Sequence, residues 1–219
     1  MKQHFFLTLT FFLAMLAFSA CSVQTGAGAS MPAPIQKTEA PVVSHPSQGE
    51  TVTIDNASAL LLTDDDGASM SLRTALLTPG HVYTAWWVVV NNPEACAARP
   101  CPATDVLSNT ETVKAEVGFA DGLVADDSGT GNFAAYLPAG ALADGWFGNG
   151  LTNPRGAEIH IVIHDHGPVI PELAANMLTT YRGGCTDGSL PPTFPDFTKE
   201  FGQAANNTCK LVQVVQFEQ

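Results

Sequence analysis

Basic side chains are scarce in this chain: nine lysines and arginines stand against 21 aspartates and glutamates, which gives a net charge of −12. A protein that binds nucleic acid needs clustered positive charge to neutralise phosphates, so the composition argues against that class of partner. The same excess of acid repels anionic lipid headgroups and favours solubility. We therefore expect no nucleic-acid partner, and a protein or small-molecule partner stays open.

Common catalytic motifs are also absent. The chain contains no Gly-x-Ser-x-Gly elbow, no phosphate-binding P-loop, no Gly-x-Gly-x-x-Gly turn and no His-Glu-x-x-His pair, each of which places specific groups around a reacting atom. The first hypothesis is therefore a non-catalytic binding or structural module that needs no cofactor. Two alternatives stay open: a copper- or zinc-binding protein, and a hydrolase of unrecognised type.

Long hydrophobic runs are confined to the N-terminus. Residues Phe5–Phe18 carry no charge, Lys2 precedes them, and Ser19 and Ala20 follow. A charged start, an apolar middle and a small-residue end are typical of an export signal, so residues 1–20 are predicted to be a signal peptide. No later segment offers eighteen continuous apolar residues, so we expect no second membrane span.

The junction after this signal has a recognisable sequence. Phe18-Ser19-Ala20 stands directly before Cys21, and the four residues resemble the lipobox of bacterial lipoproteins. The resemblance implies that Cys21 carries a lipid such as palmitate and becomes the new N-terminus. It also implies a location in the bacterial cell envelope, where the lipid on Cys21 anchors the protein to a membrane and the protein faces the periplasm or the exterior.

The cysteine count agrees with an exported protein. If Cys21 is lipidated, four cysteines remain, and in an oxidising compartment four cysteines are most simply two disulfides. Three connectivities are open, and local spacing favours Cys96–Cys101 and Cys185–Cys209. A zinc site built from the same four is the rival interpretation, but neither pair has the spacing of a zinc knuckle.

The composition and the pattern of apolar residues change near residue 50. Residues 21–49 are rich in Pro, Ser, Gly and Thr without any period, which predicts a disordered tether. Residues 50–219 alternate short apolar runs with turn residues, which predicts one all-β domain: an antiparallel β-sandwich, Ig-like or Greek-key, of about eight strands. The expected strands are 51–54, 59–63, 69–77, 82–90, 112–120, 131–137, 158–164 and 210–217. Residues 171–181 are predicted to form one short helix or a covering loop.

Residues 82–90 are apolar on both faces, which predicts a central strand. Trp86 and Trp87 lie within it. Adjacent tryptophans in such a strand are interpreted as core, and the alternative is that they line a ligand cleft. By contrast, Met70, Leu72 and Thr74 alternate with polar residues, which predicts a half-exposed strand.

Glu158-Ile-His-Ile-Val-Ile-His-Asp-His166 is the strongest candidate site. With a period of two, the isoleucines share one face, and Glu158, His160, His164 and His166 share the other. The functional interpretation is a copper or zinc site; the alternative is the wetter face of an outer strand. Residues i and i+2 are about 6.6 Å apart, so His164 and His166 can share an ion, whereas His160 is about 13 Å from His164.

Two imidazoles leave zinc or copper(II) short of ligands. The sequence offers His81, at the start of an expected strand, and the carboxylates of Asp165 and Glu158 as further ligands. Asp165 is on the opposite face of the strand unless a bulge bends the chain near Gly167.

Two acidic segments, Asp64–Gly67 and Asp126–Gly129, offer carboxylates that could hold calcium. Neither has the spaced ligands and distal glutamate of an EF-hand loop. Aspartate and glycine are also the residues that tight turns need, so both segments are interpreted as turns.

Two longer stretches resemble an uncharacterised family of exported bacterial β-sandwich proteins. They are Tyr83–Cys96 and Gly150–His160, the second followed by His166-Gly167-Pro168. The likeness spans about residues 51–219 and implies a domain type without an activity. The His-bearing strand ending in His-Gly-Pro is also similar to chordin-type and superoxide-dismutase-like sandwiches, but the chain lacks the histidines that a dismutase needs.

Overall fold

The computed structural model describes residues 33–218 of the chain. The predicted signal peptide at residues 1–20, the lipidation site at Cys21 and the start of the predicted tether lie outside the described residues, so these assignments stay predictions. Within residues 33–218 there is no helix that is both long and apolar enough to cross a membrane.

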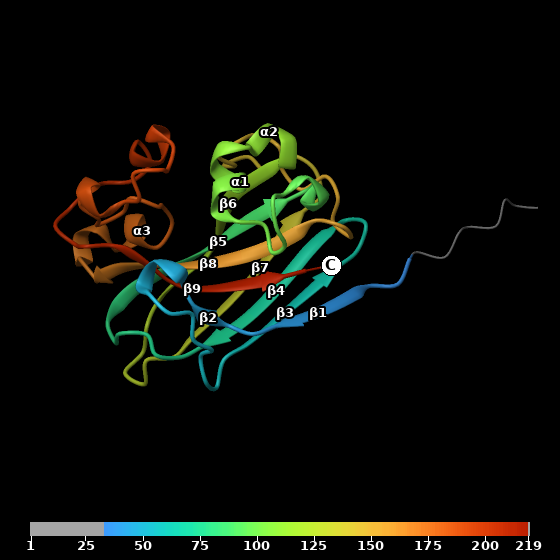
Figure 1. The fold of residues 1–219 in the computed structure, drawn as a ribbon. Helices are drawn as coiled ribbons and strands as arrows, with labels where there is room; N and C mark the ends of the chain where they lie inside the picture. The colour runs from blue at the N-terminus through green and yellow to red at the C-terminus, as the bar shows by residue number, and fades with distance from the viewer. Residues whose placement is uncertain (1–32, 219) are drawn as a thin grey trace, which may run out of the picture. The chain divides into compact units, whose positions relative to one another are not determined.

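Nine strands form two antiparallel sheets that pack as a β-sandwich, as the sequence predicts (Figure 1). The strands are β1 Gln36–Ala40, β2 Val43–Ser44, β3 Ser58–Thr63, β4 Gly67–Thr74, β5 His81–Val90, β6 Ala115–Val124, β7 Gly131–Pro138, β8 Glu158–Pro168 and β9 Lys210–Phe217. The four-stranded sheet has the order β1-β3-β4-β7, and the five-stranded sheet has the order β2-β9-β8-β5-β6. All neighbouring strands are antiparallel.

The core between the sheets follows the alternation of side chains along each strand. On β4, Met70, Leu72 and Thr74 are buried, while Ser71 and Arg73 are exposed. On β8 the core face consists of three fully buried isoleucines, at positions 159, 161 and 163. Burying each such side chain contributes about 1.5–3 kcal/mol, so this face holds β8 in register.

Strand β5 is central and buried on both faces, as predicted, because it lies between β8 and β6. Its two tryptophans have different surroundings. Trp87 belongs to the core between the sheets. Trp86 belongs to a second apolar cluster on the outer face of the five-stranded sheet.

The prediction of a disordered tether at residues 21–49 is wrong for its last part. Residues 36–40 pair with β3 in one sheet, and residues 43–44 pair with β9 in the other. Pro41 lies between the two strands, where the chain passes from sheet to sheet. Strand β1 is mostly exposed, and backbone pairing along an edge needs few apolar side chains, so composition alone hides it. Val42, which is 1% exposed, belongs to the core, and Ala40 packs against it.

Helical structure is short and lies outside the sandwich. The helices are α1 Ala103–Ser108, α2 Thr110–Val113 and α3 Ala174–Met177, with 3-10 turns at Pro46–Gln48, Pro93–Ala95, Pro171–Leu173, Asp187–Ser189 and Asp196–Lys199. The helix predicted for residues 171–181 is therefore only a 3-10 turn followed by one α-helical turn. Two expected strands are also corrected: residues 51–54 contribute one isolated bridge at Thr53, and residues 112–113 end a helix.

Two lobes cover the outer face of the five-stranded sheet. The first lobe, residues 91–113, contains α1 and α2; the second lobe, residues 169–209, contains α3. Both lie on the side of β5 and β8 that faces away from β3 and β4 (Figure 1). Each lobe contains one of the predicted disulfides, Cys96–Cys101 in the first and Cys185–Cys209 in the second.

Candidate functional site: the outer face of strand β8

The outer face of β8 is the centre of the candidate site. Glu158, His160, His164 and His166 are 0%, 5%, 1% and 0% exposed, respectively. The alternative interpretation of this face as the wetter side of an outer strand is therefore wrong. β8 lies between β9 and β5, and the two lobes exclude water from its ends. Buried polar groups need partners, so the contacts of each residue matter.

Glu158 is fully buried beneath the first lobe and is well satisfied. Its carboxylate accepts hydrogen bonds from Arg99 Nε at 2.8 Å, from the Cys101 amide at 2.5 Å and from His160 Nε2 at 2.6 Å. Burial acts to raise the pKa of Glu158, but the hydrogen bonds from His160 and Cys101 and the nearby positive charge outweigh it, and the pKa lies below its ordinary value. Glu158 is thus a buried carboxylate anion.

The bond to Glu158 decides what His160 offers to its surroundings. An ionised carboxylate can only accept, so in the neutral imidazole the proton is on Nε2 and Nδ1 is an acceptor. Among residues 33–218, Nδ1 of His160 has no hydrogen-bond partner. His160 is one of the residues that line the groove described below, so in its neutral form the ring brings one acceptor to the groove's border.

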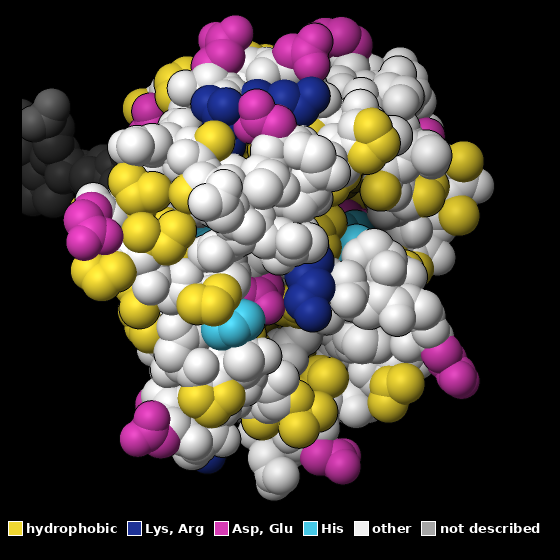
Figure 2. Space-filling view, turned by 90° about the vertical axis from the view of Figure 1, so that its left-hand side faces the viewer, with side chains coloured by type: hydrophobic (Ala, Val, Ile, Leu, Met, Phe, Trp, Pro, Cys, Tyr) yellow, Lys and Arg dark blue, Asp and Glu magenta, His cyan; other side chains and the backbone are white. Residues whose placement is uncertain are grey.

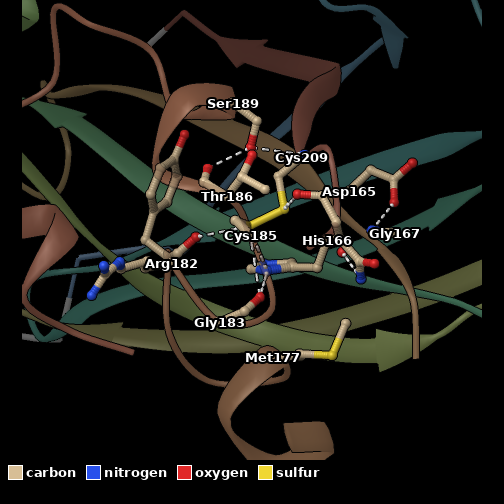
Figure 3. The surroundings of a disulfide bond; sticks show 12 residues. Asp165, His166, Gly167, Met177, Arg182, Gly183, Cys185, Thr186, Ser189 and Cys209 are labelled. Carbon is tan, nitrogen blue, oxygen red and sulfur yellow. Dashed lines mark hydrogen bonds between the residues drawn. A yellow bond between two sulfur atoms is a disulfide. The ribbon is translucent and has the colours of Figure 1, made fainter. Parts of the chain in front are cut away.

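His166 lies at the other end of the face, beneath the second lobe, where its ring meets the Gly183 carbonyl (Figure 3). Both its ring nitrogens are used. Nδ1 donates to the Gly183 carbonyl at 2.8 Å, and Nε2 is 2.8 Å from Thr84 Oγ1. The Thr84 hydroxyl accepts from Trp86 Nε1, so its own proton goes to His166. Burial lowers the pKa of His166 to about 4, and the ring is neutral near pH 7.

His164 is buried as deeply but is not satisfied. Its ring stacks on Tyr181, with 4.4 Å between centroids and 15° between planes. Its Nδ1 has no hydrogen-bond partner in the described part of the chain, and neither has the Tyr181 hydroxyl. Burial, followed by the charge of nearby His166, lowers the pKa of His164 well below its ordinary value. A buried imidazole nitrogen without a partner is costly, so it needs an explanation.

The second disulfide lies against these histidines, as Figure 3 shows for His166. Cys185 Sγ is 3.6 Å from His166 Nδ1. One ring nitrogen of His164 and the sulfur atoms of Cys185 and Cys209 all lie within 4.8 Å of one another. Sequence spacing predicts the pairing of the cysteines but gives no sign that they meet a histidine strand.

The four histidines predicted as metal ligands do not come together. His160 is bonded to Glu158. His81 contacts Asp165, and its Nδ1 is 3.0 Å from the Asp165 carboxylate. The same carboxylate accepts a hydrogen bond from the Gly167 amide at 2.7 Å. The bend that places Asp165 there is visible as register shifts in β8, on one side at Ile163/His164 and on the other opposite His81. Only His164 and His166 stay close, with centroids 4.4 Å apart.

An apolar groove with a cavity volume of about 800 Å³ lies between the two lobes. Its floor is the outer face of the sheet, at Val88 and Val162. One wall is the first lobe, at Val106 and Leu107. The other wall is an aromatic cluster formed by Trp86, Trp146, Tyr181 and Phe194. Ring centroids in this cluster lie 5.2–5.7 Å apart, mostly in edge-to-face or tilted geometry, which favours a rigid wall.

The groove reconciles the two interpretations of the tryptophan pair: Trp87 is core, and Trp86 lines a cleft. The other aromatic residues of the wall come from segments without strand or helix periodicity, so the pattern of the sequence does not group them. The signal that was available is the presence of Trp146, Tyr181 and Phe194 in loops rich in glycine and proline.

The two acidic segments are turns. Asp64 Oδ1 accepts from the amides of Asp66 and Gly67. Asp126 accepts from the amides and hydroxyls of Ser128 and Thr130. These carboxylates therefore close their own turns.

Comparison of the chain with protein-family models, with curated proteins and with solved structures gave no match.

Proposed function

We propose that this protein is a binding domain of the bacterial cell envelope, anchored by a lipid on Cys21, whose groove takes a small apolar molecule with a hydrogen-bond donor. The groove carries this proposal. Its volume of about 800 Å³ lies within the usual range of small-molecule sites, which are lined mainly by apolar and aromatic side chains with few polar groups. The disulfides indicate an oxidising, extracytoplasmic location.

The donor on the ligand follows from His160. His160 borders the groove, and its Nδ1 is an acceptor in the neutral tautomer that the bond to Glu158 fixes. A hydroxyl or an amine on the ligand would satisfy this nitrogen. No serine, threonine or cysteine among residues 33–218 is hydrogen-bonded to it, so the geometry supports binding and not the activation of a nucleophile.

The charge of the protein also restricts the charge that the ligand can carry. The chain has a net charge of −12, and on the end of the molecule in Figure 2 acidic side chains stand mostly around the periphery. Such a field disfavours anions. Within residues 33–218, the lining of the groove itself has no aspartate or glutamate and one lysine, Lys210, so nothing there attracts a cation, and a neutral ligand is the better fit.

The binding test uses a matched pair of neutral probes, N-phenyl-1-naphthylamine and 1-benzylnaphthalene, which differ in an N–H against a CH₂ group. Trp86 and Trp146, two of the three tryptophans of the chain, border the groove, so energy transfer to the amine reports its occupancy, and the hydrocarbon is measured by its displacement of the amine. We expect saturable binding of both probes. The amine should bind up to about tenfold more tightly, the value of one hydrogen bond, and His160→Phe should remove that preference.

Val162→Trp should block both probes, because the larger side chain fills the floor of the groove. The matched control is Val124→Trp at the end of β6, because Val124 is 44% exposed and is not among the residues that line the groove. Non-saturable probe binding, or binding that Val162→Trp leaves unchanged, would contradict the proposal.

The lipid anchor has a separate test. In cells fed labelled palmitate, the unchanged chain should take up the label, whereas Cys21→Ala should take up none and should keep residues 1–20. Equal labelling of the two proteins would contradict lipidation at Cys21 without bearing on the groove.

A further inference from the structure

His164 and the second disulfide form a cluster whose composition is that of a metal site. Three donor atoms, one nitrogen of His164 and the sulfurs of Cys185 and Cys209, lie within 4.8 Å of one another. All three residues are buried, at 1%, 0% and 3% exposure. The Nδ1 of His164 has no partner in the described residues, so the cluster includes a buried, neutral imidazole free to coordinate.

His166 is excluded as a ligand by its own contacts. Its two nitrogens are committed to the Gly183 carbonyl and the Thr84 hydroxyl. Its Nδ1 is 3.6 Å from Cys185 Sγ, so its ring packs beside the sulfur and helps to hold it in place. The structure thus separates two histidines that sequence spacing treats as equivalent.

We infer that reduction of the Cys185–Cys209 disulfide creates a zinc site formed by the two cysteine thiolates and His164. A dithiol reductant transfers two electrons and two protons to the disulfide and becomes a disulfide itself. Zn²⁺ then replaces the two thiol protons, which are released to solvent. The oxidised protein holds the bridge, and the reduced protein holds the metal.

The spacing of the donors suits this exchange. In a tetrahedral zinc site with Zn–S near 2.3 Å and Zn–N near 2.0–2.1 Å, donor atoms are about 3.5–3.8 Å apart. The present donors already lie within 4.8 Å, so small side-chain movements suffice once the sulfurs separate. Two thiolates and one imidazole favour zinc or copper(I) over hard cations such as magnesium and calcium.

The groove gives access to this cluster. Cys209 borders the groove, so a small dithiol and a metal ion can approach the bridge from that side. Three protein ligands leave the fourth position of zinc to water from the groove. The inference rests on His164 of β8 and on the two cysteines of the second lobe, and it stands or falls independently of the apolar ligand proposed above.

The test titrates Co²⁺ into the full chain carrying Cys21→Ala, made without a His-tag, before and after anaerobic reduction by a dithiol that is then removed. Tetrahedral thiolate ligation gives Co²⁺ a charge-transfer band and strong visible absorption. We expect neither from the oxidised protein. The reduced protein should bind one Co²⁺ per chain, and one equivalent of Zn²⁺ should displace it.

Variants locate the site. Cys96→Ser/Cys101→Ser should bind Co²⁺ after reduction, whereas Cys185→Ser/Cys209→Ser, which keeps the other pair of thiols, should not. His164→Ala keeps all four thiols, and its affinity should fall by at least the roughly 10–100-fold that loss of even an outer-shell partner costs. Near-ultraviolet circular dichroism records whether each protein is folded.

Three results would each overturn the inference. The first is binding that His164→Ala leaves unchanged. The second is binding that survives in Cys185→Ser/Cys209→Ser. The third is a reduced protein that loses its near-ultraviolet signal and does not recover it when Zn²⁺ is added.

Discussion

The two ends of the outer face of β8 both bury polar side chains, but one end keeps a charged group and the other keeps neutral ones. At one end, Glu158 lies beneath the first lobe as a charged group with three hydrogen-bond donors around it. At the other end, His164 and His166 lie beneath the second lobe as neutral rings, and His164 has an unpartnered nitrogen. The side chains at both ends are buried to the same extent.

The difference teaches that burial by itself does not set the charge of a residue. Glu158 keeps its charge because it accepts hydrogen bonds from His160 on its own strand and from the Cys101 amide of the first lobe, which also brings the charge of Arg99. The second lobe brings only Tyr181, a carbonyl and two sulfur atoms to the histidines. A group that receives no compensating partner gives up its charge.

Removing the carboxylate should produce the largest effect. Glu158→Ala leaves the Cys101 amide and the His160 Nε2–H without their acceptor and Arg99 without its buried partner, so the free energy of unfolding should fall by about 3–5 kcal/mol. Chemical denaturation measures this loss. The control is Glu94→Ala: Glu94 also contacts Arg99, at 3.2 Å, but is 87% exposed at its side chain, so the change should be below about 1 kcal/mol.

Removing the disulfides should produce the next largest losses of stability, and the two disulfides should differ in the size of the loss. They join residues 24 and 5 positions apart, and loop-closure entropy predicts losses of about 3.5 kcal/mol for Cys185→Ser/Cys209→Ser and about 2 kcal/mol for Cys96→Ser/Cys101→Ser. Denaturant midpoints of the two double variants test the order. The reverse order would mean that holding the Cys101 amide over Glu158 matters more than closing a loop.

Acid should destabilise the histidine end before the Glu158 end. The pKa of His166 is about 4 in the folded protein and about 6.5 in the unfolded chain. Between these values the unfolded chain binds more protons, so stability is full above about pH 6.5 and falls as pH decreases toward 4. For His166 alone the loss from pH 7 to pH 5 is about 2 kcal/mol, and His164 adds to it.

Glu158 behaves in the opposite manner, because its pKa is lowered in the folded protein. Its stabilisation is present above its ordinary pKa and is lost only at lower pH. Urea unfolding of the oxidised protein at pH 7, 6 and 5 measures the histidine contribution, and the dependence should be weaker in His164→Phe. An equal slope in both proteins would contradict the assignment.

The smallest expected effect distinguishes the two histidines themselves. His164→Phe keeps a ring against Tyr181 and removes an unpartnered nitrogen, so stability should be unchanged or higher by up to about 1 kcal/mol. His166→Phe leaves the Gly183 carbonyl and the Thr84 hydroxyl without their partner and should cost about 1–3 kcal/mol. Equal losses in thermal or chemical unfolding would mean that His164 has a partner after all.

Much of the sandwich follows from the sequence alone. Alternation along a strand is a local property of the extended backbone, so the buried isoleucines of β8 and the buried row on β4 can be read directly. The disulfide pairs also follow from local spacing in an exported chain. Strand β1 does not, because an exposed edge strand has no apolar alternation to reveal it.

The sequence by itself also determined that Glu158, His160, His164 and His166 share one face of a strand. Only the tertiary structure decided that this face is dry, that Arg99 reaches Glu158, that His81 lies with Asp165, and that a disulfide lies against His164. The physical reason is that these contacts join residues from 21 positions apart (His164 and Cys185) to 84 positions apart (His81 and Asp165), brought together by the pairing of β5 with β8 or by the two lobes. Their docking depends on long-range packing of aromatic and apolar side chains, which no local pattern encodes.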